Sequence, residues 1–178
     1  MSTLFVDTIN EKTTNNGVYI PGHVVQAKTA TKTNTQSVTS NSFTDISGLS
    51  VSITPSSTNS KILVLCTICI SSTFYWCPVR VLRDSTQINA PDAAGSNRLL
   101  VNGCQTTQAS GAYMLMTVPI TVLDSPSSTS ALTYKAQYAV AAASGYTAWI
   151  NKTNRDEDNS NGYDPRGSSS ITVLEVGS

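Results

Sequence analysis

The segment Lys61–Ile70, with the sequence KILVLCTICI, is the strongest indication of the fold class of this protein. Nearly all of its residues are apolar and several are β-branched, which favours a strand. Successive strand residues point to opposite faces, so a run that is apolar throughout predicts a strand buried on both sides. In a two-layer protein, one face of each sheet normally meets water. The run therefore indicates either a subunit interface or a central strand that lies under loops.

This segment also contains a C-x-x-C pattern, formed by Cys66 and Cys69, which in other contexts marks a zinc or redox site. In a strand, residues three apart point to opposite faces, so these two thiols could not bind one metal ion. No second C-x-x-C follows, and the chain has a single histidine. We therefore expect Cys66, Cys69, Cys77 and Cys104 to be buried structural thiols that behave as small apolar residues.

The same two-residue periodicity continues along the chain, interrupted by clusters of Ser, Thr, Asn, Gly and Pro. Strands are expected at Val24–Thr31, Ser37–Ile46, Leu49–Thr54, Ile62–Ser71, Val79–Leu82, Leu99–Cys104, Tyr113–Leu123, Leu132–Val140, Tyr146–Ile150 and Ser169–Val176. About ten short strands at such spacing are typical of an all-β sandwich or barrel.

Charge is sparse, because 11 basic residues balance 11 acidic ones and charged residues make up 12% of the chain, against about 25% in typical soluble domains. A neutral chain lacks the basic surface that binds nucleic acid. The scarcity of Glu and Lys argues against helical bundles. No apolar run is long enough for a transmembrane helix, and the opening MSTLFVDTINEK does not resemble a signal peptide. We therefore expect synthesis in a cytoplasm, with no membrane insertion and no nucleic-acid partner.

The N-terminal segment Thr3–Gly22 differs from the rest, because it resembles strand, turn and strand with Asn16-Gly17 at the turn. A Pro-Gly pair then interrupts the chain. A hairpin of two strands is marginally stable alone, so this one must pack on another surface. We expect an N-terminal arm at residues 1–22 and a β domain at residues 23–178.

Catalytic motifs are missing from the sequence. It has no G-x-S-x-G, no P-loop and no dinucleotide-binding glycine pattern, and one histidine excludes H-E-x-x-H. Paired carboxylates for glycoside hydrolysis could come from Asp84, Asp92, Asp124 and Asp156, but these residues stand in turn-like sequence rather than in aromatic-rich segments. We expect no enzymatic activity and no cofactor.

Asp156 and Asp158 begin a pattern that resembles a calcium-binding loop. An EF-hand loop needs Gly at its sixth position and Glu at its twelfth, where this chain has Asn161 and Gly167. We therefore expect a solvated loop. Asp156 and Asp158 are weak candidates for a metal site that joins loops of neighbouring subunits.

Two loops and several aromatic side chains are candidates for contact with other molecules. Ala90–Asn97 is rich in small residues, while Asn151–Ser170 has the densest charge and is long for a connection in a compact domain. In one interpretation a sugar-stacking surface is formed by Tyr75, Trp76, Tyr146, Trp149 and Tyr163. In the other, the core is filled by Phe74, Trp76 and Trp149. We expect Trp149 in the core.

Three stretches resemble one family: VDTINEKTTNNGVYIPGHVVQ at residues 6–26, FTDISGLSVSITPSSTNSKILV at 43–64 and RGSSSITVLEVG at 166–177. They are similar to small structural proteins of tailed bacteriophages, particularly marine and cyanobacterial phages. The resemblance implies a jelly roll of the C1q and tumour-necrosis-factor type that associates as a homotrimer. It also implies a location in the virion, with the trimer contacting other phage structural proteins and a host surface glycan.

The resemblance further implies that the N-terminal arm docks the trimer on the particle and that outer loops contact the host. The residues expected to anchor the arm are Leu4, Phe5, Val6, Ile9, Val18, Tyr19 and Ile20. The expected host-contact residues are Tyr75, Asp92, Arg155, Asp156, Tyr163 and Arg166. Because no long shaft precedes the β domain, a short fibre is expected. The alternatives are a decoration protein that stabilises the capsid and a carbohydrate-binding jelly roll without a virion role.

Overall fold

The computed structural model describes residues 6, 8, 22–93, 95–106, 113–141 and 145–177, and every regular element in these ranges is a β-strand. The strands are β1 (Val24–Lys32), β2 (Gln36–Val38), β3 (Thr44–Ile53), β4 (Lys61–Ser72), β5 (Trp76–Arg83), β6 (Thr86–Gln87), β7 (Gly103–Thr106), β8 (Met116–Asp124), β9 (Leu132–Tyr138), β10 (Ala148–Ile150) and β11 (Ser169–Val176). The all-β prediction is confirmed.

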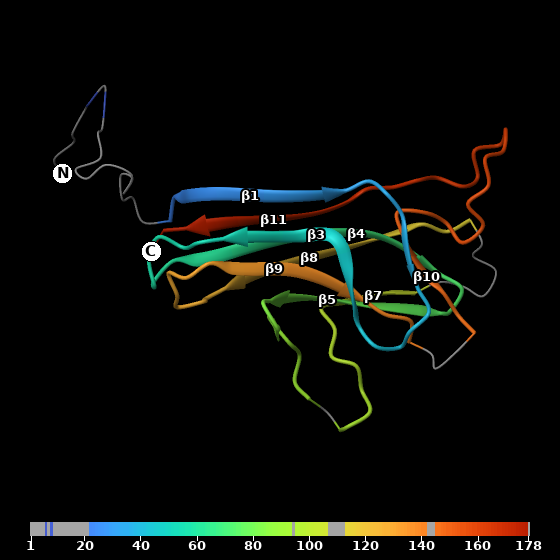
Figure 1. Cartoon of the computed structure of the whole chain (residues 1–178), viewed down its shortest axis with the longest axis horizontal. Helices are drawn as coiled ribbons and strands as arrows, with labels where there is room; N and C mark the ends of the chain where they lie inside the picture. Colours follow the sequence, from blue (N-terminus) through green and yellow to red (C-terminus); the bar gives the residue numbers. More distant parts are fainter. Residues whose placement is uncertain are drawn as a thin grey trace, which may run out of the picture.

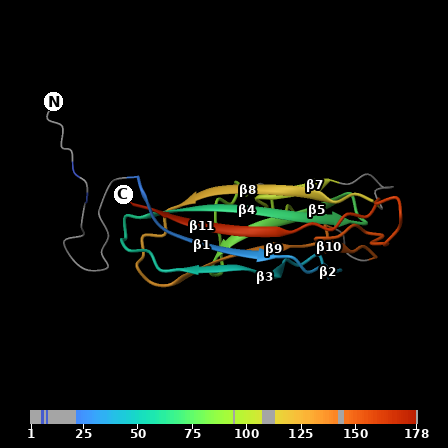
Figure 2. The same ribbon diagram turned by 90° about the horizontal axis from the view of Figure 1, so that it is seen from above.

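The strands form two antiparallel sheets that pack face to face (Figure 1). Sheet A places its long strands in the order β1, β11, β4 and β8, with β10 and β2 continuing beside the last residues of β4. Sheet B runs β3, β9, β5, with β6 and β7 both against β5. This order, in which strands adjacent in a sheet come from distant parts of the chain, is that of a jelly roll. Figure 2 shows β8 and β4 along one side of the molecule and β3 along the other.

The core lies between the sheets, where alternate residues of each strand meet. It consists mainly of Ile, Val and Leu side chains, with Tyr134 and Tyr138 as its largest fully buried members. Alternation is regular in β9 and β11, which bury every second residue. Ser and Thr occupy many of the outward positions, which explains why a chain with so few charges has a polar surface.

Strand β4 was expected to be buried on both faces, and within one chain this prediction is wrong. Its even-numbered residues from Ile62 to Ile70 face the core, whereas its odd-numbered residues point outward and Leu65 is 39% exposed. The predicted separation of the C-x-x-C thiols is confirmed, because Cys66 lies in the core and Cys69 lies on the outer side.

The region of β2 and β3 also differs from expectation. A single strand over Ser37–Ile46 was predicted, but β2 ends at Val38 and β3 continues without a break past Ser47. The register of β3 against β9 shifts between Asp45 and Ser50, and Gly48 in this bulge has a φ of 81°. Glycine tolerates this left-handed conformation, so the bulge bends the strand instead of ending it.

Three further expectations are corrected. Strand β7 begins at Gly103 rather than Leu99, which is exposed in the preceding loop. Trp149 lies on the outward side of β10, because successive strand residues point to opposite faces and its neighbours Ala148 and Ile150 are the ones buried in the core. Cys104 is exposed rather than buried, since it points to the outer side of sheet B.

Both ends of the β domain lie together at one end of the sandwich (Figure 1). The backbone N–H of Gly22 donates to the carbonyl of Gly177 at 2.8 Å, and Gly177 donates in turn to His23 at 2.9 Å. Of the predicted anchoring residues only Val6 is described, and it is exposed. The other six, and the predicted turn at Asn16-Gly17, lie outside the described residues. No helix in the described ranges is long and apolar enough to cross a membrane.

Candidate assembly and host-contact surfaces

The outer side of sheet A has an unbroken apolar row across its four long strands, which we call the leucine row: Ala27, Leu174, Leu63 and Leu123. Each is the register partner of the next, in strands β1, β11, β4 and β8. Leu123 is 60% exposed at the end of the row. Such a contiguous apolar patch on a sheet face is typical of interaction sites.

The neighbouring positions on this side of sheet A are uncharged as well. The next row is formed by Thr29, Thr172, Leu65 and Thr121, in which the hydroxyl oxygens of Thr29 and Thr172 are 3.0 Å apart. Among the outward-pointing residues of β1, β4, β8 and β11, all of them described, Lys61 is the only charged one. It stands at the first position of β4 and donates to Ser125 at 2.8 Å.

The outer side of sheet B is built differently, around a network of charged and amide groups. Asp45 on β3 accepts hydrogen bonds from Lys135 at 2.8 Å and from Gln137 at 2.6 Å, both on β9. Arg80 on β5 donates to Gln137 at 2.8 Å and lies 4.0 Å from the ring centroid of Phe43. Burial alone would raise the pKa of Asp45, but the hydrogen bonds from Lys135 and Gln137 outweigh it and lower the pKa. The part of this side formed by β3, β9 and the middle of β5 is suited to water.

Residues 151–168, which we call the ion-pair loop, are held together by charged hydrogen bonds. Arg155 binds Asp164 through both Nε and Nη2, at 2.9 and 2.5 Å, and Thr153 donates to the same carboxylate at 2.7 Å. The Asp164 side chain is only 1% exposed. The hydrogen bond from Arg155 is the main cause that lowers the pKa of Asp164. The loop is therefore ordered by its own charges.

Asp156 is the second acidic centre of this loop and one of the two candidate metal ligands. Its oxygens accept from Arg166 at 2.5 and 2.9 Å and from Lys152 at 3.2 Å. Burial would raise the pKa of Asp156, but these hydrogen bonds lower it. Asp158, the other candidate, is exposed. Within the described ranges no three Asp, Glu, His or Cys side chains are placed to hold one metal ion, so the loop offers charge-paired carboxylates in place of a ligand set.

Asn151 positions the base of the ion-pair loop, a role that the sequence analysis missed. Its buried amide donates to the carbonyls of Lys32 and Asn34 at 2.7 and 3.1 Å, and its Oδ1 accepts from Ser169 at 2.7 Å. Its φ of 64° is left-handed. Asn tolerates this conformation better than most residues, so an Asn directly after a strand was the available signal.

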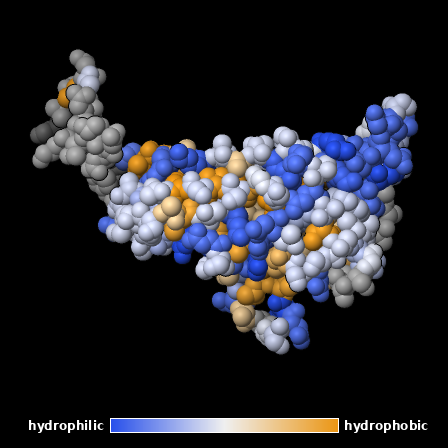
Figure 3. Space-filling view, viewed as in Figure 1, coloured by the Kyte–Doolittle hydropathy of each residue, from blue (hydrophilic) through white to orange (hydrophobic). Residues whose placement is uncertain are grey.

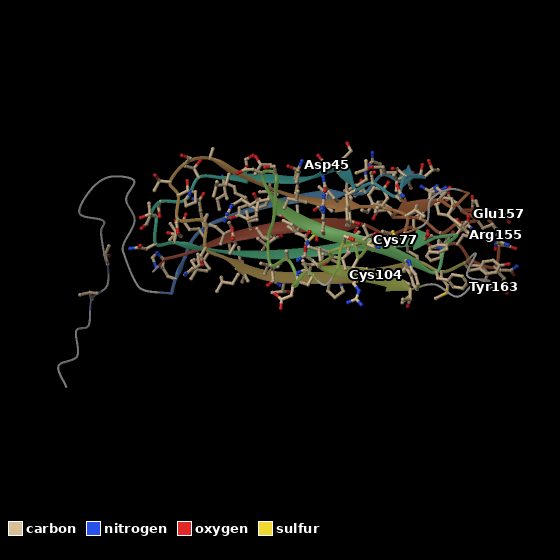
Figure 4. All side chains as sticks on the ribbon, turned by 90° about the horizontal axis from the view of Figure 1, so that it is seen from below. Asp45, Cys77, Cys104, Arg155, Glu157 and Tyr163 are labelled. Atoms are coloured by element: carbon tan, nitrogen blue, oxygen red, sulfur yellow. The ribbon has the colours of Figure 1, made fainter. Side chains whose placement is uncertain are left out.

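Two groups of exposed aromatic side chains lie at the end of the sandwich that carries the ion-pair loop (Figure 1). In one group, the rings of Tyr113 and Tyr163 meet edge to face at 5.7 Å, and the Arg155 guanidinium stacks 4.3 Å from the Tyr113 centroid. Tyr163 is 56% exposed. Figure 4 shows Tyr163 beside Arg155 and Glu157 at one tip of the molecule. Polar, charged and aromatic groups are thus presented together.

The second group surrounds Phe74 in the turn between β4 and β5. The Phe74 ring contacts Tyr75 at 5.6 Å, Trp76 at 5.7 Å and Tyr146 at 4.6 Å between centroids. Phe74 is partly buried against the core, whereas its three neighbours are exposed. The core interpretation therefore applies to Phe74 and the surface interpretation to Tyr75 and Trp76.

The structure brings together most of the predicted host-contact residues. Arg155, Asp156, Tyr163 and Arg166 share the ion-pair loop, at the end of the sandwich opposite Gly22 and Gly177 (Figure 1). The turn with Tyr75 lies at the same end. Asp92 is separated from them, in the long loop after β6 that projects from the side of the molecule. A comparison with protein-family models finds no match for this chain, and neither does a comparison with curated proteins.

Proposed function

We propose that this protein is a non-enzymatic bacteriophage virion protein, a homotrimeric short fibre that docks through its N-terminal arm and presents its outer loops to the host. The observation that carries the proposal is the uncharged outer side of sheet A with its leucine row. Burying one Leu side chain contributes about 1.5–3 kcal/mol. Because an unpaired charge is costly at an interface, a face with Lys61 as its only charge suits contact with identical copies.

The arrangement of the two ends of the β domain also supports this role. Residues 1–21 enter at the end where Gly22 and Gly177 are hydrogen-bonded, and the ion-pair loop lies at the other end. A trimer of such subunits would offer its particle-binding arms on one side and three identical loop sets on the other. A rigid body with three weak binding sites binds far more tightly than one with a single site, and no catalytic step is needed.

The test begins with the mass of the full chain in solution, by light scattering, where a trimer is expected. Electron micrographs of antibody-labelled virions should then show the protein at the tail. Deleting residues 1–22 should leave a folded trimer that is no longer incorporated, because the β domain keeps its core and its interface.

Each arm of this experiment has a contrary outcome. A monomeric full chain would contradict the trimer, and normal incorporation of the truncated chain would contradict the anchoring role. Label confined to the capsid, with loss of capsid stability in virions that lack the protein, would identify a decoration protein instead.

A further inference from the structure

A groove on the outer side of sheet B lies on the opposite sheet from the leucine row. Its volume is about 360 Å³, and it lies between β5 and the loop that leads into β7. Figure 3 shows hydrophobic side chains gathered on this loop and where it meets the body of the sandwich. The described residues that line the groove are Trp76, Pro78, Asn97, Leu99, Val101, Cys104 and Ala141.

The wall of the groove is held in place by the base of the loop. The Oδ1 of Asn102 accepts from the backbone of Val81 at 2.9 Å, and its Nδ2 donates to the carbonyls of Ile88 and Asn89 at 2.9 and 3.1 Å. The backbone N–H of Asn102 donates to Val79 at 3.0 Å. One side chain thus closes the base of the loop, which reduces the part of the chain that a ligand would have to order.

Trp76 supplies the aromatic surface of the groove. It is 48% exposed, and its ring stands at 88° to the Phe74 ring, which supports it from the core side. Tyr75 and Tyr146 contact the same Phe74 ring and extend the aromatic surface beyond the groove. An indole that is supported but half exposed is a typical hot-spot residue of binding sites.

The absence of charged side chains among the described lining residues favours a neutral ligand. All the lining side chains are uncharged, and Asn97 adds an amide that can donate and accept hydrogen bonds. A pyranose ring has an apolar C–H face for an aromatic ring and a hydroxyl edge for an amide. The volume is within the range of about 300–1,000 Å³ found for small-molecule sites.

We propose that this groove binds a neutral sugar ring of a surface glycan, with Trp76 stacking on the ring and Asn97 contacting its hydroxyl groups. The inference rests on the proposed function, in which the glycan belongs to the host. The ion-pair loop is a poorer sugar site, since the carboxylates of Asp156 and Asp164 are already bound to Arg and Lys side chains.

The test uses the full chain on an array of neutral hexose oligosaccharides and of uronic-acid oligosaccharides. Binding to neutral members is expected, and Trp76→Ala should weaken it by about tenfold or more. The matched control is Phe43→Ala, which removes a ring from the same side of sheet B outside the groove and should leave binding unchanged. Because Trp76 and Trp149 are the two tryptophans, a Trp149→Phe variant reports the environment of Trp76 alone, and its fluorescence should change when a neutral hexoside binds.

The opposite results would overturn the inference: no bound oligosaccharide, preference for acidic ones, or loss of binding in Phe43→Ala but not in Trp76→Ala. A fluorescence response to 1-octanol but to no hexoside would identify a general apolar groove and also overturn it. Failure here is distinguishable from failure of the virion role. Glycan binding by a protein that is absent from particles would reject only the virion role, and incorporation without glycan binding would reject only the sugar site.

Discussion

The outer sides of the two sheets share one core and one alternation pattern, yet they differ in chemistry. Sheet A presents Leu63, Leu123 and Leu174 in one row, whereas sheet B presents Asp45 and Arg80 joined through Gln137. Alternation in a strand decides only which residues face the core. The residues on the other side are free to match either water or another protein surface, and in the proposed trimer the two sheets represent these two outcomes.

The largest expected effect comes from placing charge on the leucine row. Leu63→Glu combined with Leu123→Glu should weaken self-association by at least about a hundredfold, because two apolar contacts are lost and two carboxylates are desolvated. Both side chains point away from the core, so the monomer should stay folded. Sedimentation velocity over a concentration series measures the association.

The matched control puts the same two charges on sheet B. Ser50 and Thr133 point outward on β3 and β9, and Ser50→Glu combined with Thr133→Glu should leave the proposed trimer intact. If the sheet B variant dissociates and the sheet A variant does not, the two surfaces have been assigned the wrong way round.

A smaller effect is expected at Glu175, the one charged residue of β11, whose side chain is buried. This fully buried carboxylate accepts from the Ser56 backbone and hydroxyl at 2.7 and 2.6 Å and from Gln26 at 2.6 Å. Glu175→Gln removes the charge and turns an amide donor toward these donors. The free energy of unfolding should fall by about 1–3 kcal/mol, as measured by urea denaturation.

The pH dependence of stability gives this prediction a sign. Burial would raise the pKa of Glu175, but the hydrogen bonds from Ser56 and Gln26 lower it below the ordinary 4.5. A carboxyl whose pKa is lower in the folded state stabilises the fold above the unfolded pKa, and loses that contribution as the pH falls through the folded value. Wild type should therefore lose more stability than Glu175→Gln below about pH 4.5. Equal losses of stability in the two proteins as the pH falls would contradict this.

The smallest effect is expected at the exposed charges of sheet B. Asp45→Ala removes the contacts with Lys135 and Gln137, yet it should cost no more than about 1 kcal/mol, because water replaces exposed partners easily. The loss should shrink further in high salt. A loss as large as that of Glu175→Gln would show that sheet B is also covered by a partner.

Most strands could be predicted from sequence because their alternation is regular. Ser169–Val176 coincides with β11, and Val24–Thr31 differs from β1 by one residue. The bulge at Gly48 was missed, because a glycine in a strand and a glycine in a turn look alike until the partner strand is known. The shared loop of most host-contact candidates followed from sequence proximity, whereas the groove at Trp76 did not, since its walls come from segments far apart in the chain.

An all-β sandwich can be predicted from the sequence alone, because two-residue alternation and sparse charge leave few other ways to bury the apolar residues of this chain. The sequence also predicts that the Cys66 and Cys69 thiols point apart. What the apolar outer side of Lys61–Ile70 meets within one chain could not be predicted, because it depends on the strand order and on the packing of the sheets. The strand order places Leu63 between Leu123 and Leu174, and sheet B covers only the opposite side. An apolar residue in a strand is expected to be buried. The strand order and the packing of the sheets decide whether another part of the same chain buries it.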